Sequence, residues 1–113
     1  MINGAIENLQ LPDNITRVTQ WHYDRNLIDG ASDKAQLIKL QEEVDELAAS
    51  ISNNTTPIDD IGDIIVVLIN IAERNGLSIN DCLAHAYNDI KDRKGKMVDG
   101  IFVKESKQQQ QLF

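Results

Sequence analysis

Two pairs of acidic residues have the spacing and the surroundings of a metal site. Glu43 and Glu46 lie three residues apart in the segment LQEEVDEL, and Asp60 and Asp63 repeat that offset in PIDDIGDIIVVLINIA. Residues three apart on a helix lie about 60° from each other, so each pair projects from one side. Two facing helices that carry such pairs can hold Mg²⁺ or Mn²⁺, because these hard cations prefer oxygen ligands. The spacing therefore predicts a divalent-cation site to which both pairs contribute.

A solvated acidic surface is the alternative interpretation of the same segments. Acids in a first helical turn favour the helix dipole, and acids beside an apolar stripe keep a surface soluble. This interpretation suits Glu42, Asp45 and Asp59, which point away from the paired acids. It fits Asp63 less well, because the run Ile64–Ile69 that follows is apolar at every position. A carboxylate there is expected to lose water and to need a cation or hydrogen-bond donors.

Basic residues gather near the end of the last predicted helix. Lys91, Arg93, Lys94 and Lys96 account for four of the eleven basic residues in the chain. Lys94 and Lys96 fit an interaction with the helix dipole. Lys91 and Arg93, with Asn88 one turn before Lys91, are candidates for binding phosphate oxygens beside a metal.

Three residues elsewhere are further candidates for binding a substrate. Trp21, the only tryptophan, suits either a core position or a ring that stacks on a base. Arg25 lies one turn later, and Lys39 lies on the same helix edge as the glutamate pair. His22 and His85 are isolated and are expected on the surface or hydrogen-bonded in the core. No His or Cys has the spacing of a zinc site.

Helices are predicted to position these residues. Asp13 is expected to cap a first helix that runs to about Asn26, and Ser32 is expected to cap a second. Apolar residues recur in the second helix at intervals of three or four and predict one stripe. The stripe consists of Leu37, Leu40, Val44, Leu47 and Ile51.

The third helix is expected to be central, because its apolar run leaves no face for water. Thr56 is its predicted cap, Pro57 its first helical residue and Gly76 its end.

Two further elements are predicted toward the C-terminus. Ser78 and Asp81 have the capping pattern of a fourth helix, which ends before Gly95. Asp99 and Gly100 then stand between two short β-type runs, which predicts a small hairpin.

The length of 113 residues fits one domain, which we expect at residues 13–104, after an N-terminal lead at 1–12 and before a polar tail at 105–113. Eighteen acids against eleven bases give a net charge of −7, which argues against binding to duplex nucleic acid or an anionic membrane. The single cysteine and the lack of a signal or membrane-spanning pattern predict a cytoplasmic protein.

The segments KLQEEVDEL and DDIGD together resemble the E-E-x-x-E and E-x-x-D signature of the MazG-like nucleotide pyrophosphohydrolases, with Glu42 as the leading acid. The segment WHYDRNL is similar to the H-x-x-R-N-L element of the dCTP-hydrolysing branch, and NDIK is similar to its N-x-x-K element. The resemblance covers roughly residues 17–96. The sequence departs from the signature at Asp60, where the family has a glutamate that is one methylene longer.

The resemblance implies an all-α fold, a four-helix MazG-like bundle with a short C-terminal β-hairpin here, that pairs as a homodimer or homotetramer. It also implies that Glu43, Glu46, Asp60 and Asp63 bind Mg²⁺ and that a nucleoside triphosphate is split into the monophosphate and pyrophosphate. Glu43 or Glu46 is then the candidate general base.

Two alternatives remain open from the sequence. One is hydrolysis of phosphoribosyl-ATP on the same architecture. The other is a non-catalytic acidic helical module that binds cations or a partner without turnover.

Overall fold

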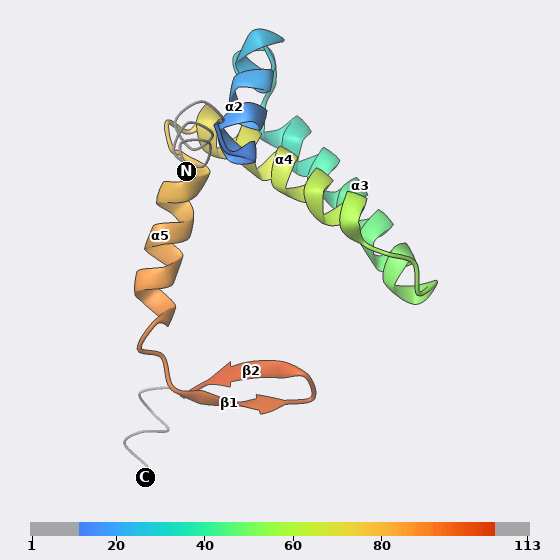
Figure 1. The fold of residues 1–113 in the computed structure, drawn as a ribbon, viewed down its shortest axis with the longest axis vertical. Helices are drawn as coiled ribbons and strands as arrows, with labels where there is room; N and C mark the ends of the chain where they lie inside the picture. The colour runs from blue at the N-terminus through green and yellow to red at the C-terminus, as the bar shows by residue number, and fades with distance from the viewer. Residues whose placement is uncertain (1–11, 106–113) are drawn as a thin grey trace, which may run out of the picture. The chain divides into compact units, whose positions relative to one another are not determined.

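The computed structural model describes residues 12–105, in which four helices precede one β-hairpin (Figure 1). The helices are α2 (Asn14–Asp24), α3 (Asp33–Ser52), α4 (Ile58–Arg74) and α5 (Ile79–Ile90), and the strands are β1 (Gly95–Val98) and β2 (Ile101–Lys104). The all-α class with a C-terminal hairpin is therefore confirmed. Nearly all of the predicted lead and tail, residues 1–11 and 106–113, lies outside the described residues.

The chain divides into two compact units, one that ends at Ile79 and one that begins at Asn80. The first contains α2, α3 and α4, and the second contains most of α5 and the hairpin. A single helical domain at 13–104 stays a prediction. None of the helices within residues 12–105 is both long and apolar enough to cross a bilayer.

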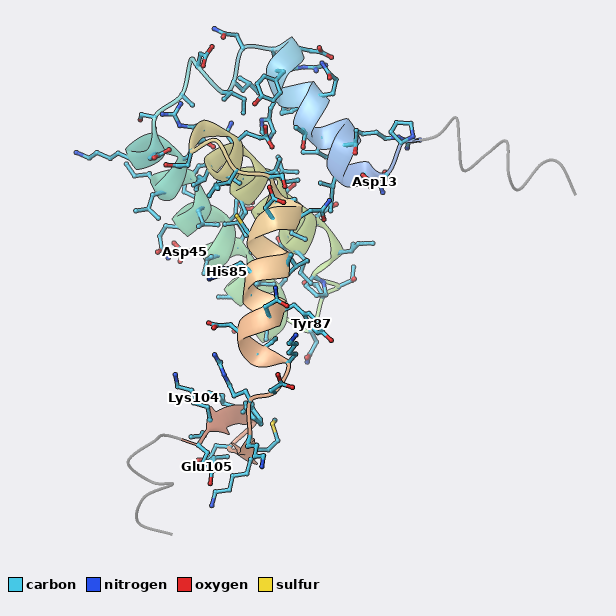
Figure 2. All side chains as sticks on the ribbon, turned by 90° about the vertical axis from the view of Figure 1, so that its left-hand side faces the viewer. Asp13, Asp45, His85, Tyr87, Lys104 and Glu105 are labelled. Carbon is cyan, nitrogen blue, oxygen red and sulfur yellow. The ribbon has the colours of Figure 1, made fainter. Side chains whose placement is uncertain are left out.

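Side-chain caps fix the starts of α2 and α3, as predicted. Asp13, labelled at the start of α2 in Figure 2, accepts a hydrogen bond from the Thr16 N–H at 2.8 Å. Ser32 Oγ accepts one from the Ala35 N–H at 3.1 Å. Each cap satisfies an N–H that the helix itself leaves unpaired.

Replacing Ser32 with alanine is expected to lower the free energy of unfolding by about 1 kcal/mol, because the Ala35 N–H loses its acceptor. Urea denaturation measures this change. Ser32→Asp is the matched control and should keep most of the stability, since aspartate also caps helices. Equal loss in both variants would show that the cap contributes nothing.

The start of α4 differs from the prediction by one residue. Pro57 is the N-cap rather than the first helical residue, with ψ of 19° and no side-chain capping bond. The prediction that Thr56 caps this helix is therefore wrong. Asp59 and Asp60 in the first turn favour the helix dipole instead.

The end of α4 follows the prediction. Gly76 has φ of 72°, a left-handed conformation that glycine adopts without a steric cost. Its N–H donates to the Glu73 carbonyl at 3.1 Å, and the Leu77 N–H donates to the Ala72 carbonyl at 2.9 Å. This pair of bonds is a Schellman motif.

Helix α4 is the centre of the first unit, as the sequence predicts. It lies beside α3, which runs antiparallel to it, and it also contacts α2 (Figure 1). The buried hydrophobic residues among those described are Val67, Ile69 and Ala72 of α4 and Ile28 of the α2–α3 loop. This core is small for a chain of this length.

Polar contacts hold the start of α3 against the end of α4. The Arg74 Nε donates to Asp33 Oδ1 at 2.9 Å, and another Arg74 nitrogen donates to the Ile28 carbonyl. Asn75 donates to the second Asp33 oxygen at 3.2 Å. The Arg74 hydrogen bond lowers the pKa of Asp33 below its ordinary value. These contacts help to fix which residues of α3 and α4 lie opposite each other.

The predicted stripe on α3 is only partly covered. Leu40 and Leu47 are half-buried, whereas Leu37, Val44 and Ile51 are exposed at intervals of seven residues. Helix α4 also has an exposed apolar row, with intervals of three, four and three residues. This row consists of Ile58, Ile61, Ile65 and Leu68. We refer to these seven residues as the uncovered apolar face.

The hairpin in the second unit forms at the predicted turn. Asp99 and Gly100 both have positive φ, of 51° and 82°, which is typical of a two-residue hairpin turn. The strands are antiparallel, with Val98 opposite Ile101 and Gly95 opposite Lys104.

Candidate metal centre

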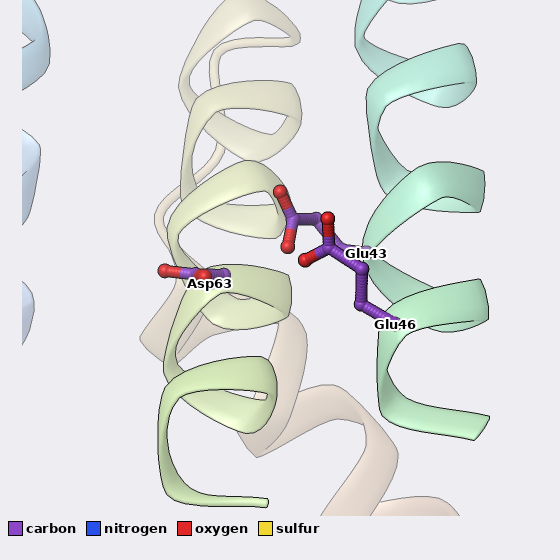
Figure 3. Close-up of side chains that lie close together, drawn as sticks. All are labelled: Glu43, Glu46 and Asp63. Carbon is purple, nitrogen blue, oxygen red and sulfur yellow. The ribbon is translucent and has the colours of Figure 1, made fainter. Parts of the chain in front are cut away.

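Three of the four predicted metal ligands lie together between α3 and α4. One carboxylate oxygen from each of Glu43, Glu46 and Asp63 lies within 4.8 Å of the others. Figure 3 shows the two glutamate side chains extending from α3 toward α4, which carries Asp63. Helix periodicity places the glutamates on one side of α3, and the antiparallel packing brings Asp63 beside them. The predicted convergence of the two helices is therefore observed for these three residues.

Glu43 is the buried member of the cluster, with only 5% of its surface exposed. Its Oε1 forms an ion pair with Lys39 Nζ at 3.1 Å, but its Oε2 has no hydrogen-bond partner. A buried polar atom without a partner costs about 1–3 kcal/mol, and more if it is charged. The chain thus places an unsatisfied carboxylate oxygen inside a group of acids.

The expected loss of water at Asp63 is only partial: desolvation is the main cause of its raised pKa, but its side chain is not buried. Asp63 is exposed, whereas Glu43 is buried.

The pKa values of two ligands reflect their crowding. The charge of Glu43 is the main cause that raises the pKa of Glu46. Desolvation is the main cause that raises the pKa of Asp63, with the charge of Glu43 second. Both shifts mean that ionised Glu46 and Asp63 are disfavoured without a cation.

The donor set fits a hard divalent cation. All three ligands are carboxylates, which Mg²⁺ and Mn²⁺ prefer, and Mg²⁺ is usually bound by a few carboxylates with the remaining positions left to water and phosphate. Lys39 replaces a divalent cation only in part, since its single ammonium group neutralises at most one of the three carboxylate charges. Its pKa is raised by the hydrogen bond to Glu43.

Asp60 is not part of this group of three. Its charge nevertheless contributes to raising the pKa of both Glu46 and Asp63, so it lies within electrostatic range. Its side chain is one methylene shorter than the glutamate of the signature that this segment resembles. A direct role for Asp60 as a ligand stays a prediction.

The metal-free protein is expected to lose stability as the pH rises from about 4 toward neutrality. The ordinary pKa values are 4.5 for Glu46 and 3.8 for Asp63, and both are raised in the folded state. Between the ordinary and the raised values the folded chain holds more protons than the unfolded chain, so its free energy of unfolding falls with pH. Mg²⁺ binds the ionised groups and should offset this loss increasingly as the pH rises.

Thermal denaturation across this pH range, with chelator or with Mg²⁺, measures both effects. Glu46→Gln is the control and should flatten the metal-free profile. A profile that Mg²⁺ leaves unchanged at neutral pH would contradict a cation site.

A pocket of about 530 Å³ is lined by α2, the α2–α3 loop, α3 and α4. Trp21 and Lys39, two of the predicted substrate-binding residues, both line it. Lys39 also contacts Glu43, so the pocket adjoins the acidic cluster. Arg25 is stacked on the Trp21 ring, with its guanidinium carbon 4.7 Å from the ring centre. Arg25 is not among the residues that line this pocket, and substrate binding by Trp21, Arg25 and Lys39 stays a prediction.

Asn88, Lys91 and Arg93 belong to the second unit. All three are exposed, and Arg93 lies 3.9 Å from Asp89 in a long ion pair. Their assignment to a substrate stays a prediction.

Asn70 is a polar residue of this pocket that was not predicted as a site residue. It is 1% exposed, and its side-chain oxygen has no hydrogen-bond partner. Its Nδ2 lies 3.3 Å from His22 Nδ1, which gives that buried histidine the satisfied core role expected of it. The signal was present in the sequence, because Asn70 is the one polar residue within the run Ile64–Ala72.

Comparison with known proteins identifies one viral relative and no family. A segment of 63 residues, 54% of this chain, is 38% identical to a protein of Haemophilus phage HP1 (strain HP1c1) described as an uncharacterized 18.2 kDa protein in the rep-hol intergenic region. The aligned segment spans only 39% of that phage protein. The chain matches no protein family model and no solved structure.

Proposed function

We propose that this chain is a Mg²⁺-dependent nucleotide pyrophosphohydrolase of the MazG-like kind, which hydrolyses a nucleoside triphosphate to the monophosphate and pyrophosphate. Mn²⁺ is the alternative cation. The sequence resemblance supplies the reaction, and the cluster of Glu43, Glu46 and Asp63 supports a cation site where that resemblance expects one.

The observation that carries the proposal is the buried Glu43 Oε2, which has no hydrogen-bond partner although Glu43 belongs to the cluster. A structural carboxylate at a buried position is normally satisfied by hydrogen bonds. A cation would satisfy Oε2 and would also remove the repulsion that raises the pKa of Glu46. A purely structural role explains neither feature, since helix packing does not need three adjacent acids.

The chain's own residues have distinct roles in this proposal. Glu43, Glu46 and Asp63 hold the cation, which when bound neutralises phosphate charge and makes a nearby water easier to deprotonate. Glu43 or Glu46 is the candidate for accepting the proton of the attacking water, because both carboxylates would lie beside the cation. Lys39, which lies beside Glu43, is the proposed phosphate contact. A phosphate-binding role for Asn88, Lys91 and Arg93 rests on the sequence pattern alone.

Product analysis tests this function. The protein is incubated with Mg²⁺ and a panel of ribo- and deoxyribonucleoside triphosphates, together with phosphoribosyl-ATP, in isotopically labelled water. We expect pyrophosphate and a labelled monophosphate, since attack at the α-phosphorus leaves the new oxygen there. Release of inorganic phosphate would contradict the proposed bond cleavage.

Two other outcomes assign the alternatives. Turnover of phosphoribosyl-ATP alone would identify a phosphoribosyl-ATP pyrophosphohydrolase. Cation binding without turnover of any compound would identify a non-catalytic acidic module. The cluster of Glu43, Glu46 and Asp63 lacks Asp60, the fourth ligand of the signature, and this observation supports the non-catalytic alternative.

We further propose that the chain pairs with another copy as a homodimer or homotetramer through the uncovered apolar face of α3 and α4. Such pairing would complete a helical bundle of the MazG-like type and enlarge the small core. The net charge of −7 and the single cysteine support a cytoplasmic protein that binds neither duplex nucleic acid nor membranes.

A further inference from the structure

The pocket beside the acidic cluster has the size and lining of a small-molecule site. Its volume of about 530 Å³ lies in the range typical of ligand pockets. Its walls are mainly apolar, with Leu27, Ala31, Val66 and Val67 among them, and Trp21 contributes an aromatic surface. A lining of this kind suits a flat, largely apolar ring such as a nucleobase.

The orientation of the Asn70 side chain is fixed by its neighbours. Its Nδ2 donates to the Leu27 carbonyl at 3.0 Å and lies 3.3 Å from His22 Nδ1. A flipped amide would set two acceptors, the Asn70 oxygen and the Leu27 carbonyl, against each other. The oxygen is therefore the atom left without a partner.

The histidine contact supports the same orientation. His22 Nε2 lies 3.0 Å from the Val66 carbonyl, which can only accept, so Nε2 carries the proton. In the neutral ring Nδ1 is then an acceptor and takes a hydrogen bond from Asn70 Nδ2. Both amide protons of Asn70 are thus committed to the protein. Its oxygen has no donor among the described residues, and Asn70 lines the pocket, so a group that enters the pocket is the candidate donor.

We propose that Asn70 Oδ1 selects the base of the nucleotide by accepting a hydrogen bond from an exocyclic amino group, so that cytosine or adenine is preferred over the corresponding keto bases. This inference rests on the proposed function. Lys39 lines the pocket and also contacts Glu43, so a nucleotide with its base in the pocket would have its phosphates near the acidic cluster. A keto oxygen at the same position would face the Asn70 oxygen with no proton between them. A site built to hydrogen-bond one group rejects an analogue that lacks it.

Free nucleosides test the pocket without any need for hydrolysis. Cytidine and uridine differ by an amino group against a keto group, and adenosine and inosine form a second matched pair. Trp21 is the only tryptophan, so its single indole N–H signal in a ¹⁵N-correlated NMR spectrum reports binding in the presence of chelator. We expect cytidine or adenosine to bind at least about tenfold more tightly than its keto counterpart.

Variants separate Asn70 from a rival within the same pocket. Gln36 also lines the pocket and could read an amino group itself, so Gln36→Leu is the matched control and should keep the preference. Asn70→Leu should lose the preference for amino bases. If that variant fails to fold, the comparison of cytidine with uridine and of adenosine with inosine on the wild-type protein still tests the inference. Equal binding within each pair, no binding of any nucleoside, or loss of preference in Gln36→Leu would overturn the inference.

The same experiments separate this inference from the proposed function. Triphosphate turnover without base preference would leave the pyrophosphohydrolase standing and refute the role of Asn70. Nucleoside preference without turnover would leave the role of Asn70 as a base reader standing and refute the hydrolase.

Discussion

Replacing Glu43 with glutamine is expected to lower nucleotide turnover by at least about 100-fold and to abolish stabilisation by Mg²⁺. Substitution of residues that merely support metal ligands typically costs 10- to 100-fold in affinity or activity, so loss of a ligand should cost at least as much. Glutamine keeps the shape of the buried side chain but removes the charge that attracts the cation. Steady-state pyrophosphate release and thermal denaturation with added Mg²⁺ measure the two effects.

Glu42→Gln is the matched control for this prediction. Glu42 precedes Glu43 on α3 and also approaches Lys39, at 3.7 Å, but it is outside the group of three ligands. Turnover should therefore change little. If both variants lost activity equally, the general negative charge of α3 would matter rather than the ligand set.

The metal-free Glu43→Gln protein should be at least as stable as the wild type near neutral pH. The substitution removes the charge that raises the pKa of Glu46 and the unsatisfied buried oxygen. A gain in stability together with a loss of function is typical of a functional site. A large loss of metal-free stability would instead indicate that Glu43 has a structural role through Lys39.

Charged substitutions on the uncovered apolar face of α4 are expected to convert the protein into monomers. The double variant Ile61→Glu, Leu68→Glu places two carboxylates in a row whose intervals of three and four residues are typical of a helix–helix seam. Burying either charge in an interface of aliphatic residues would cost several kcal/mol. Sedimentation equilibrium should give a wild-type mass of two or four chains and a variant mass near the chain mass of 12.7 kDa.

Ile38→Glu is the control for assembly. Ile38 is 57% exposed on α3 but lies outside the uncovered apolar face, so its substitution should leave the mass unchanged. A wild-type protein that sediments as a single chain at micromolar concentration would contradict pairing.

Local chemistry made much of the fold predictable. Asp13 and Ser32 cap their helices because their side chains reach the first free N–H groups, and Asp99 with Gly100 forms a turn because both accept positive φ. The start of α4 was harder, since Thr56 and Pro57 offered a plausible cap that the chain does not use. The difference is one residue, within the usual uncertainty of helix boundaries.

The site was predictable only as far as helix periodicity determines it. The three-residue offset placed Glu43 and Glu46 together on α3, and the apolar run indicated that α4 would lie against them. Periodicity within one helix does not determine how far two helices rotate against each other. The burial of Glu43 rather than Asp63 and the exclusion of Asp60 depend on that rotation.

Asn70 depends on tertiary structure in the same way. Its partners, the Leu27 carbonyl and His22, are more than forty residues away in the sequence. A single polar residue in an apolar run signals that some buried partner exists, but only packing reveals which one.

Paramagnetic broadening by Mn²⁺ in the NMR spectrum of the whole protein tests the central claim most directly, because Mn²⁺ substitutes for Mg²⁺ at carboxylate sites. At substoichiometric Mn²⁺ we expect the signals of residues adjacent to Glu43, Glu46 and Asp63 to broaden first, and we expect excess Mg²⁺ to restore them. Broadening that spreads evenly over exposed acids such as Asp45 and Asp81, or that persists in Glu43→Gln, would contradict the account.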